Sequence, residues 1–441
     1  MTSKSKRFID GYVADSLYPS MFHFRFTAAW IDSFLVRSHI PSPRKPRGPF
    51  TMVDAGCGDG YGLIVNAVAH PEGRFIGFDA SAAHIARGKL LIRALKVPNV
   101  ELKRMTLANA RVDVKADYVT CQGLLSWISR ANQEALWKFA SQTLKPGGAF
   151  AVGYNSLPGW SQVVPFQRLA RAFSDYVPGN SAERFLAAFV LTSATGLVSE
   201  NTLANIEKDM MGKWGGYVAH EYLNQYWDPL WSGDVIQAAE SNDLRFVRTA
   251  MEQRLRDDFG FTKAQRAVLS TIFNDRARET AADLLRNTGF RTDLFVKAGF
   301  RTATPTATRQ ARLNQYWVAQ NPAADVEYFC QTPAGKLRFD NRAAHTIVAR
   351  LEAGPANILS ISDVAENDLL NTMDALFTAG LVRPVDPPMD VPAAARFNAW
   401  ISAGKSNINA LVGAHGTVVP AQNANELDAP TRQRLGITHP D

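Results

Sequence analysis

Cysteine is scarce in this chain, which contains only Cys57, Cys121 and Cys330 among its 441 residues. An odd number of widely separated cysteines argues against a disulfide framework and against a cysteine zinc site, and it favours a reducing compartment. Long apolar runs are missing too, and none approaches the roughly 18 residues that a membrane-spanning helix needs. The basic N-terminus is not followed by the apolar stretch of a secretory signal. We therefore expect a cytoplasmic protein with no membrane segment.

Basic charge is present, but it is not concentrated in one place. The net charge is +7, and the densest cluster, Arg44-Lys45-Pro46-Arg47, lies in a linker bracketed by prolines. No stripe of basic and aromatic residues follows it, so we expect no nucleic-acid partner. The metal motif H-E-x-x-H is also missing, because His220-Glu221 is followed by Asn224 where the second histidine would stand. We expect no metal ion, and the basic surface favours an acidic substrate or partner.

The most informative stretch runs from Phe50 to Gly62. Apolar residues lead up to Val53, and glycines then occupy every second position from Gly56 onward. This pattern predicts a strand, a tight glycine turn and a helix N-terminus, whose backbone amides favour a polar or anionic group. A second short strand ends in Asp79, about 20 residues further on, the offset at which an acid meets ribose hydroxyls in nucleotide-binding folds. The two features together predict a nucleotide-type ligand.

The spacing D-x-G-x-G-x-G, which begins at Asp54, resembles motif I of class I S-adenosylmethionine-dependent methyltransferases, and Phe78-Asp79 resembles their motif II. The resemblance implies that S-adenosylmethionine is the cofactor. It places the methionine end at Asp54, Gly56, Gly58, Asp59 and Gly60, and the ribose hydroxyls at Asp79, next to Ala80. A nicotinamide or flavin dinucleotide is the alternative ligand, and a glycine turn without a ligand is the structural alternative. Asp59 either contacts the carboxylate side of the cofactor or caps the helix.

The adenine end of the expected site departs from the family pattern. The resemblance predicts an acid or an amide after the third strand, whereas this chain has Met105 and Thr106. A backbone amide with a stacked apolar side chain would replace that contact, and Gln122 after the fourth strand completes the expected cofactor-binding set. The Asn-Pro-Pro-Tyr signature of amide and base N-methyltransferases is absent after that strand, which disfavours nucleic-acid bases and glutamine amides as acceptors.

Strands alternate with helices along residues 51–154, as a parallel α/β sheet requires. Two late strands, Leu244–Thr249 and Arg291–Val296, would complete a Rossmann-like, seven-stranded class I methyltransferase sheet. A breaker turn is expected at Lys145–Gly148 and one long helix at Thr262–Arg286. A separate all-helical regulatory module is the alternative to a helical insertion in this sheet.

Four regions are expected along the chain. They are an aromatic N-terminal cap segment (1–50), the methyltransferase domain (51–300) with a helical insertion at about 161–230, a smaller C-terminal winged-helix-like domain (301–390), and a tail rich in Pro, Ala and Asn (391–441). Packing on the first helix is the alternative role for the aromatic segment. Because the C-terminal domain lacks basic helix faces, we interpret it as a protein-contact unit, with a homodimer as one arrangement.

Three further groups of residues narrow the resemblance. They are Tyr18-Pro19-Ser20, Gly123 with Ser126-Trp127, and Tyr154-Asn155 with Pro158-Gly159-Trp160. Together they resemble class I methyltransferases that carry a methyltransferase regulatory domain, a group that includes the rickettsial protein-lysine methyltransferases. The likeness covers about residues 10 to 300 and continues at Ala219–Asn224 and Leu285–Gly289. Two departures are Thr27-Ala28-Ala29, where the group usually has Thr-His-Pro, and Leu125, where an aromatic residue is common.

Methyl transfer needs an aligned donor and acceptor, exclusion of water and a deprotonated nucleophile. The candidates for catalysis are Tyr154 and Asn155, at the carboxyl end of the fifth strand, and His220. Substrate-binding candidates are Tyr18, Trp127, Trp160, Glu221 and Tyr222. The structural alternatives are a turn at Tyr154-Asn155, a His-Glu pair that supports the insertion, and aromatic core packing around Tyr222.

The sequence therefore predicts a methyltransferase that moves a methyl group from S-adenosylmethionine to an amine or hydroxyl on a protein, a peptide or a natural product. Protein lysine is the acceptor that the family resemblance favours. A small-molecule O- or N-methyltransferase with a closed aromatic pocket is the second hypothesis. A cofactor-binding scaffold without catalysis is the third.

Overall fold

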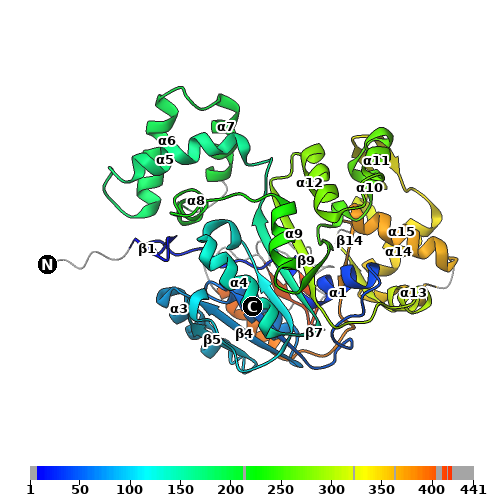
Figure 1. Cartoon of the computed structure of the whole chain (residues 1–441). Coiled ribbons are helices and arrows are strands. Elements are labelled where there is room, and N and C mark those ends of the chain that lie inside the picture. Colours follow the sequence, from blue (N-terminus) through cyan, green and yellow to red (C-terminus); the bar gives the residue numbers. More distant parts are fainter. Residues whose placement is uncertain are drawn as a thin grey trace.

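The protein is organised around a twisted seven-stranded sheet flanked by helices (Figure 1). The computed structural model describes residues 7–211, 215–320, 323–361, 364–403, 410–414 and 416–419. The strand order is β5-β4-β3-β6-β7-β9-β8, and β9 runs antiparallel to both of its neighbours. The strands are β3 (Phe50–Ala55), β4 (Gly73–Asp79), β5 (Val100–Arg104), β6 (Ala116–Cys121), β7 (Leu144–Asn155), β8 (Leu244–Thr249) and β9 (Phe290–Lys297). The predicted fold class is confirmed, including the two late strands.

Helices cover both faces of this sheet because successive strand residues point to opposite sides. Met52 of β3 belongs to a core with α1 (Ala28–Arg37), α2 (Tyr61–Ala69) and α3 (Ala82–Leu95). Its neighbour Val53 belongs to the core on the other face. That second core contains α4 (Arg130–Thr143) and α9 (Ser232–Glu240). The sheet is therefore the middle layer, and its carboxyl edge is left for a ligand.

The predicted turn at Lys145–Gly148 lies inside the first part of β7, so the fifth strand begins earlier than expected. Gly147 takes a positive φ of 77° there, and the pairing with β6 shifts register between Ala116 and Tyr118. A glycine can take this backbone conformation without leaving the ladder. The breaker residues thus produce an irregular strand start instead of a separate turn.

The single helix predicted over Thr262–Arg286 is wrong. The chain forms α10 (Asp257–Gly260), α11 (Lys263–Leu269) and α12 (Asp275–Arg286). The hydroxyls of Ser270 and Thr271 donate to backbone carbonyls within the end of α11. Asn274 then caps α12, where its side chain accepts the amide of Ala277 at 3.1 Å. Side chains that bond to the local backbone compete with helix continuation, and three such residues within five positions end it.

Four helices between β7 and α9 form an insertion above the carboxyl edge of the sheet (green in Figure 1). They are α5 (Val164–Ser174), α6 (Ser181–Ala194), α7 (Glu200–Met211) and α8 (Gly215–Tyr222). Phe166, Phe185 and Tyr222 form the centre of a separate small core in this insertion. The insertion thus has its own packing, although it is threaded into the sheet domain.

The N-terminal segment crosses between the insertion and the sheet. It forms a hairpin of β1 (Phe8–Ile9) and β2 (Tyr12–Val13) and a short 3-10 helix (Phe24–Phe26) before α1. Asp10 and Gly11 at the hairpin tip have positive φ values of 49° and 84°. These values are typical of the tight two-residue turn that Asp-Gly favours. We call residues 7–27 the strap.

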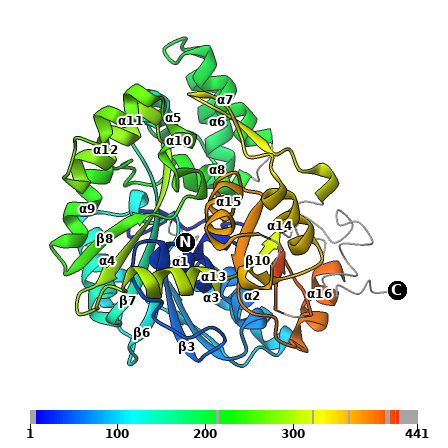
Figure 2. The ribbon, with the colours of Figure 1, turned by 90° about the vertical axis from the view of Figure 1, so that its right-hand side faces the viewer.

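The C-terminal part of the chain packs against α1 and the sheet rather than standing apart (Figure 2). Trp30 and Phe34 of α1 meet Phe377, which in turn meets Trp317, with ring centroids 5.0 to 5.4 Å apart. Arg44 also pairs with Asp386 through two hydrogen bonds of 2.7 and 2.8 Å. These contacts make one continuous apolar core across the expected boundary near residue 301.

The elements of this C-terminal part alternate between short strands and helices. They are α13 (Pro305–Leu313), β10 (Tyr316–Ala319), β11 (Phe329–Thr332), β12 (Gly335–Arg338), α14 (Arg342–Glu352), β13 (Ala356–Asn357), α15 (Glu366–Thr378), β14 (Val382–Val385), α16 (Ala393–Ala403), β15 (Leu411–Val412) and β16 (Val418–Val419). The winged-helix detail stays a prediction, and residues 404–409, 415 and 420–441 of the predicted tail lie outside the described residues. Within the described chain, every helix is too short or too polar to cross a bilayer.

Candidate functional site

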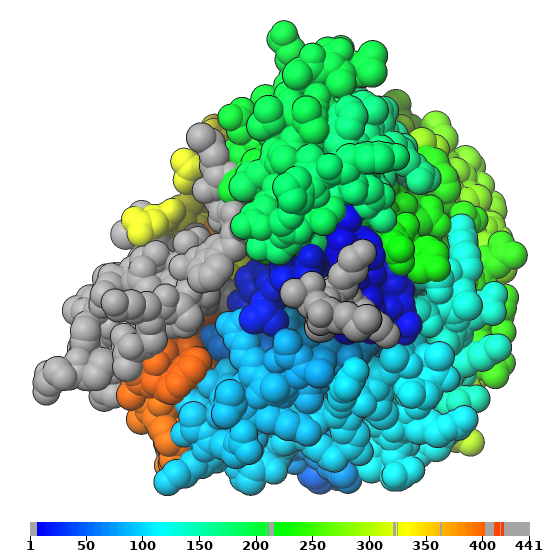
Figure 3. Space-filling model, turned by 90° about the vertical axis from the view of Figure 1, so that its left-hand side faces the viewer, coloured from blue at the N-terminus to red at the C-terminus, as the bar shows by residue number. Residues whose placement is uncertain are grey.

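A cavity of about 1410 Å³, including the space open to solvent, lies at the carboxyl ends of β3, β4 and β6. The strap forms its roof, wedged between the insertion and the sheet domain (blue in Figure 3). Its floor is the glycine turn after β3, and the ends of β4, β5 and β6 form its sides. This is the place at which open α/β sheets bind their ligands.

The glycine turn is fixed to the neighbouring strand by its own amides. Gly56, Gly58 and Gly60 all have positive φ values, between 58° and 73°. The amides of Gly56 and Cys57 donate to the carbonyl of Phe78 at 2.9 and 3.0 Å. A side chain at position 56 would come within 2.6 Å of Leu124, so only glycine fits. The turn is therefore shaped before any ligand arrives.

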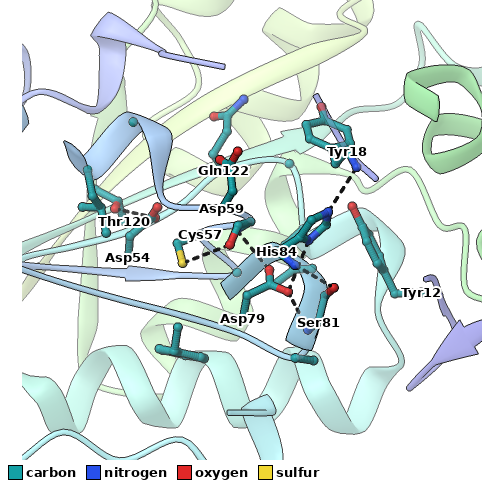
Figure 4. A pocket seen from close by; sticks show the side chains of 18 of the residues that line it. Tyr12, Tyr18, Asp54, Cys57, Asp59, Asp79, Ser81, His84, Thr120 and Gln122 are labelled. Carbon is teal, nitrogen blue, oxygen red and sulfur yellow. Dashed lines mark hydrogen bonds and ion pairs between the residues drawn. The ribbon is translucent and has the colours of Figure 1, made fainter. Parts of the chain in front are cut away.

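Asp79 is held at the end of β4 by two backbone amides (Figure 4). One oxygen accepts from Gly58 at 3.0 Å and the other from Ser81 at 2.8 Å. Ser81 also caps α3, because its hydroxyl accepts the amide of His84 at 3.3 Å. The carboxylate is thus oriented in the cavity wall, in the position expected for an acid that binds ribose hydroxyls.

His84 connects this acid to the roof. Its Nε2 accepts the amide of Tyr18 at 3.1 Å, so Nε2 carries no proton and Nδ1 does. Nδ1 lies 3.6 Å from Asp79. The histidine therefore links the ribose side of the cavity to the strap.

Asp54 lies at the opposite end of the cavity, where it accepts a hydrogen bond of 2.7 Å from the hydroxyl of Thr120. Burial raises the pKa of the Asp54 carboxyl to about 7, and the charge of Asp79 adds to this shift. Gln122 also lines the cavity, and its Oε1 has no hydrogen-bond partner among the described residues. A buried acceptor without a partner calls for a donor on a ligand.

Asp59 caps α2 and anchors the strap. Its Oδ1 accepts the amide of Tyr61 at 3.1 Å, and its Oδ2 accepts the hydroxyl of Ser20 at 2.5 Å. Arg87 approaches both partners, at 2.8 Å from the Ser20 hydroxyl and 3.3 Å from Asp59. Asp59 thus holds the first residue of α2 and also lines the cavity, so its predicted contact with the cofactor stays a prediction.

An aromatic chamber adjoins the cavity between the strap and the insertion. It consists of Tyr12, Tyr18, Trp127 and His220. The ring of Tyr12 lies 6.1 Å from Trp127 and 5.0 Å from His220, and Tyr18 meets His220 edge-on at 5.3 Å. The indole N–H of Trp127 is buried without a partner among the described residues. This donor is the second polar atom of the site that needs a ligand.

His220 stays neutral in this chamber. Its Nε2 donates to the carbonyl of Ser16 at 2.9 Å, so the Nδ1 lone pair is unprotonated. That nitrogen is buried without a partner among the described residues. Burial lowers the pKa of His220 to about 4. The neutral histidine can therefore accept a hydrogen bond at Nδ1.

Most of the predicted cofactor residues lie together, whereas most of the predicted catalytic residues lie elsewhere. The cavity is lined by Asp54, Gly56, Gly58, Asp59, Asp79, Ala80, Met105, Thr106 and Gln122. Gly60 is the remaining cofactor candidate, and it forms the N-cap of α2. Tyr18 and Trp127 also line the cavity. The lining does not include Tyr154, Asn155, Trp160, His220, Glu221 or Tyr222.

Three of these residues are part of the packed structure. The hydroxyl of Tyr154 is buried and donates to Asp293 at 2.6 Å. The indole of Trp160 donates to the carbonyl of Gly289 at 2.7 Å. Tyr222 stacks on Phe185 at 5.3 Å inside the insertion. Tyr222 therefore packs in the core, as its structural alternative predicts, whereas Tyr154 lies in strand β7 and not in a turn.

Asn155 and Glu221 form a pair behind the aromatic chamber. The side-chain amide of Asn155 donates to Glu221 at 2.6 Å, and its backbone amide donates to Ser126 at 2.9 Å. Both side chains are buried. The pair fixes α8 to the end of β7, next to the segment that carries Trp127.

The sequence interpretation missed Tyr12, His23 and His84, which all line the cavity. The signal for Tyr12 was available, because Asp10-Gly11 between two short apolar pairs is a strong hairpin pattern. The signal for His84 was the Ser81 cap, which places the third residue of the helix over the strand end. His23 has no local signal of its own.

The residues of the cavity fit S-adenosylmethionine. The oriented carboxylate of Asp79 suits two ribose hydroxyls, and the acidic Asp54 suits an amino group. Gln122 and Trp127 line the same cavity, and the Oε1 of Gln122 and the Nε1 of Trp127 have no hydrogen-bond partner among the described residues. Met105 and Thr106 line it at the end of β5, where the adenine ring is expected.

Comparisons with known proteins agree with this geometry. Residues 52–148 match the family described as "Methyltransferase domain", and residues 215–297 match the "Predicted methyltransferase regulatory domain". The second match spans α8, the two late strands and the helices between them. It therefore includes His220 of the aromatic chamber.

Similar proteins are found over most of the chain. An uncharacterised protein of Synechocystis (sll1526) is 24% identical over 385 residues, which cover 85% of this chain and 75% of that protein. An uncharacterised protein of Rickettsia prowazekii (RP028) is 26% identical, over 45% of this chain and 82% of that protein. The solved structure of PKMT2 from Rickettsia typhi in complex with AdoHcy has a TM-score of 0.68 at 18% identity, and covers 92% of this chain and 86% of that one. The two matched families, the seven-stranded sheet and the cavity at its carboxyl edge together place the chain among the class I S-adenosylmethionine-dependent methyltransferases that carry a methyltransferase regulatory domain.

Proposed function

We propose that this enzyme methylates an aliphatic amine, with the side chain of a protein or peptide lysine as the acceptor. The observation that carries the proposal is the charge of the cavity. Its described lining includes Asp10, Asp54, Asp59 and Asp79 but no lysine or arginine, although the chain as a whole has a net charge of +7. Such a site attracts cations and disfavours carboxylate acceptors.

The aromatic chamber supports the same choice. A cationic amine is stabilised at the face of tyrosine and tryptophan rings, most strongly where water is excluded. Tyr12 and Tyr18 remain neutral, because burial raises the pKa of both phenols above its ordinary value. Neutral hydroxyls can orient the lone pair of an amine without competing with it for the methyl group.

S-adenosylmethionine supplies a methyl group on a sulfonium, which transfers to a nucleophile in line. The enzyme's own residues then have to bind the acceptor, orient it and exclude water from it. In the proposal, Asp79 holds the ribose, the strap excludes water, and the chamber orients the amine. His220 accepts a hydrogen bond from the amine, either directly or through a tyrosine hydroxyl, and so helps to orient it.

Lysine is favoured over other amines by the resemblance to the rickettsial lysine methyltransferases and by the fold shared with PKMT2. A small-molecule N-methyltransferase would use the same chamber, so it remains the second hypothesis. The scaffold hypothesis predicts cofactor binding without turnover.

The test is a methylation assay with labelled S-adenosylmethionine and a panel of lysine-containing proteins and peptides, read out by mass spectrometry. We expect label on the lysine ε-amine, and we expect Asp79→Ala to abolish it. Asp113→Ala, a change to an exposed aspartate that does not line the cavity, is the matched control. Label only on hydroxyl or carboxyl oxygen would refute the amine assignment. Cofactor binding without transfer to any acceptor would support the scaffold.

A further inference from the structure

The cofactor carries a carboxylate on its methionine end, and the cavity has to hold that charge. Proteins usually bind carboxylates with arginine or lysine. The described lining of this cavity contains neither. The glycine-turn amides do not replace them, because those of Gly56, Cys57 and Gly58 already donate to β4 or to Asp79. A neutral side-chain donor is therefore required at this end.

The path of the strap shows which side chain can reach it. The amide of Tyr18 is bound to His84 on the ribose side of the cavity. The hydroxyl of Ser20 is bound to Asp59 in the glycine turn. The carbonyl of Met21 lies 3.5 Å from the position of a Cβ on Gly62, so the strap passes over the start of α2. From Tyr18 to Met21 the strap therefore runs from the ribose end of the cavity toward the methionine end.

His23 is the next polar residue on this path, and it lines the cavity. Its ring lies edge-on to that of Phe26, with the ring centroids 6.4 Å apart. Phe26 in turn lies beside Gln122, since a Cβ on Gly153 would be 3.2 Å from Phe26 and 2.7 Å from the Gln122 oxygen. The imidazole therefore packs on a ring that lies beside Gln122, and His23, Gln122 and Asp54 all line the same cavity.

The imidazole is a neutral donor. Burial lowers the pKa of His23 to about 4, and the charge of Arg25 acts in the same direction. Arg25 itself is bound to Glu252 by two hydrogen bonds of 2.7 and 3.0 Å and does not line the cavity. His23 thus offers one N–H and one lone pair, in a positive field from a guanidinium that is already paired.

We propose that His23 binds the α-carboxylate of the cofactor through its ring N–H, facing the α-amino group at Asp54. This assignment depends on the cofactor of the proposed reaction and is independent of the acceptor. A neutral donor suits a ligand whose sulfonium lies nearby, because a lysine or arginine there would repel that charge. His23 is in this view a cofactor-binding residue that also makes the roof sensitive to the presence of the cofactor.

The test compares three ligands by isothermal titration: S-adenosylmethionine, its decarboxylated form, and 5′-methylthioadenosine, which lacks the whole amino-acid end. Loss of a hydrogen bond to a charged group weakens binding about 10- to 100-fold. We therefore expect His23→Ala to weaken S-adenosylmethionine binding by about that factor. The other two ligands should change by less than about twofold.

Three further variants keep the experiment decisive. His23→Asn and His23→Gln each restore one N–H, at the position of Nδ1 or Nε2, and one of them should recover binding. His345→Ala, a histidine exposed on α14, is the control for a loss of imidazole elsewhere. Equal weakening of all three ligands would mean that His23 only supports the roof, and this would overturn the proposal. Unchanged binding of S-adenosylmethionine would overturn it too. If His23→Ala does not fold, the same comparison uses His23→Asn and His23→Gln: one of the two should keep the preference of the wild type for S-adenosylmethionine over its decarboxylated form and the other should lose it, and a preference unchanged in both would overturn the proposal.

Discussion

Binding of the cofactor should weaken as the pH falls through 7, because Asp54 must be ionised to pair with an amino group. Burial holds the pKa of this carboxyl at about 7 in the free protein. Above that pH the carboxylate is ready and affinity is full. Below it a proton must leave before the ammonium can pair, so affinity is lost on the acid side.

The size of this effect follows from one linked proton. Each pH unit below the pKa reduces affinity about tenfold, which corresponds to about 1.4 kcal/mol. We expect affinity for S-adenosylmethionine to be about twofold below its maximum at pH 7 and about tenfold below it at pH 6. Titration calorimetry between pH 5.5 and 8.5 measures this directly. Two buffers of different ionisation enthalpy at pH 6 should show release of about one proton.

Asp54→Asn is the matched control, because it keeps the shape and the contact with Thr120 but cannot ionise. It should bind weakly at every pH and show no slope. The same raised pKa means that the ionised carboxylate destabilises the folded protein above pH 7, so Asp54→Asn should raise the free energy of unfolding at pH 8 by about 1–3 kcal/mol. A flat affinity profile in the wild type, or a slope that persists in Asp54→Asn, would refute the reasoning.

Three other substitutions have expected outcomes. Gly56→Ala combines a positive φ with a Cβ 2.6 Å from Leu124, so it should cost about 1–3 kcal/mol of stability and prevent cofactor binding; wild-type affinity in this variant would show that the turn is not fixed. Ser20→Ala removes the bond to Asp59, so we expect about 1 kcal/mol lower stability against urea and, by stopped-flow measurement, cofactor release about 5- to 20-fold faster. Tyr154→Phe removes one buried hydrogen bond, so we expect about 1–2 kcal/mol lower stability and an unchanged kcat/KM; a large drop in kcat with normal stability would restore Tyr154 as a catalytic candidate.

The cofactor half of the site could be predicted from the sequence because it depends on local patterns. The glycine spacing places Gly58 in a turn after one strand, the acid pattern places Asp79 at the end of the next strand, and the parallel sheet brings the two together. Tyr154 shows why the acceptor half could not be predicted. It sits at the carboxyl end of β7 as expected, but its side chain points to the face where Arg291 and Asp293 of β9 lie. The direction of a side chain at a strand end depends on a register with a strand more than 130 residues away, which no local pattern encodes.

Long-range contacts also explain why the sequence did not predict that the strap forms the roof of the cavity. Tyr12 and His23 acquire a role only because the strap lies across the cavity. The contacts that hold it there join Ser16 to His220 and Tyr18 to His84, across long separations in the chain. The hairpin itself had a sequence signal, but its location did not. For the roof, the sequence therefore predicted the hairpin turn but not the place where the strap lies.

The two ends of the strap are fastened to different bodies. Its first part is bonded to the insertion, since Val13 donates to Asn224 and Ser16 accepts from His220. Its second part is bonded to the sheet domain through Tyr18 and Ser20. The strap therefore connects the two bodies across the cavity, and we expect a tilt of the insertion to displace the residues around Tyr18. We therefore expect a partner that binds the helices of the insertion to change the rate at which the cofactor dissociates.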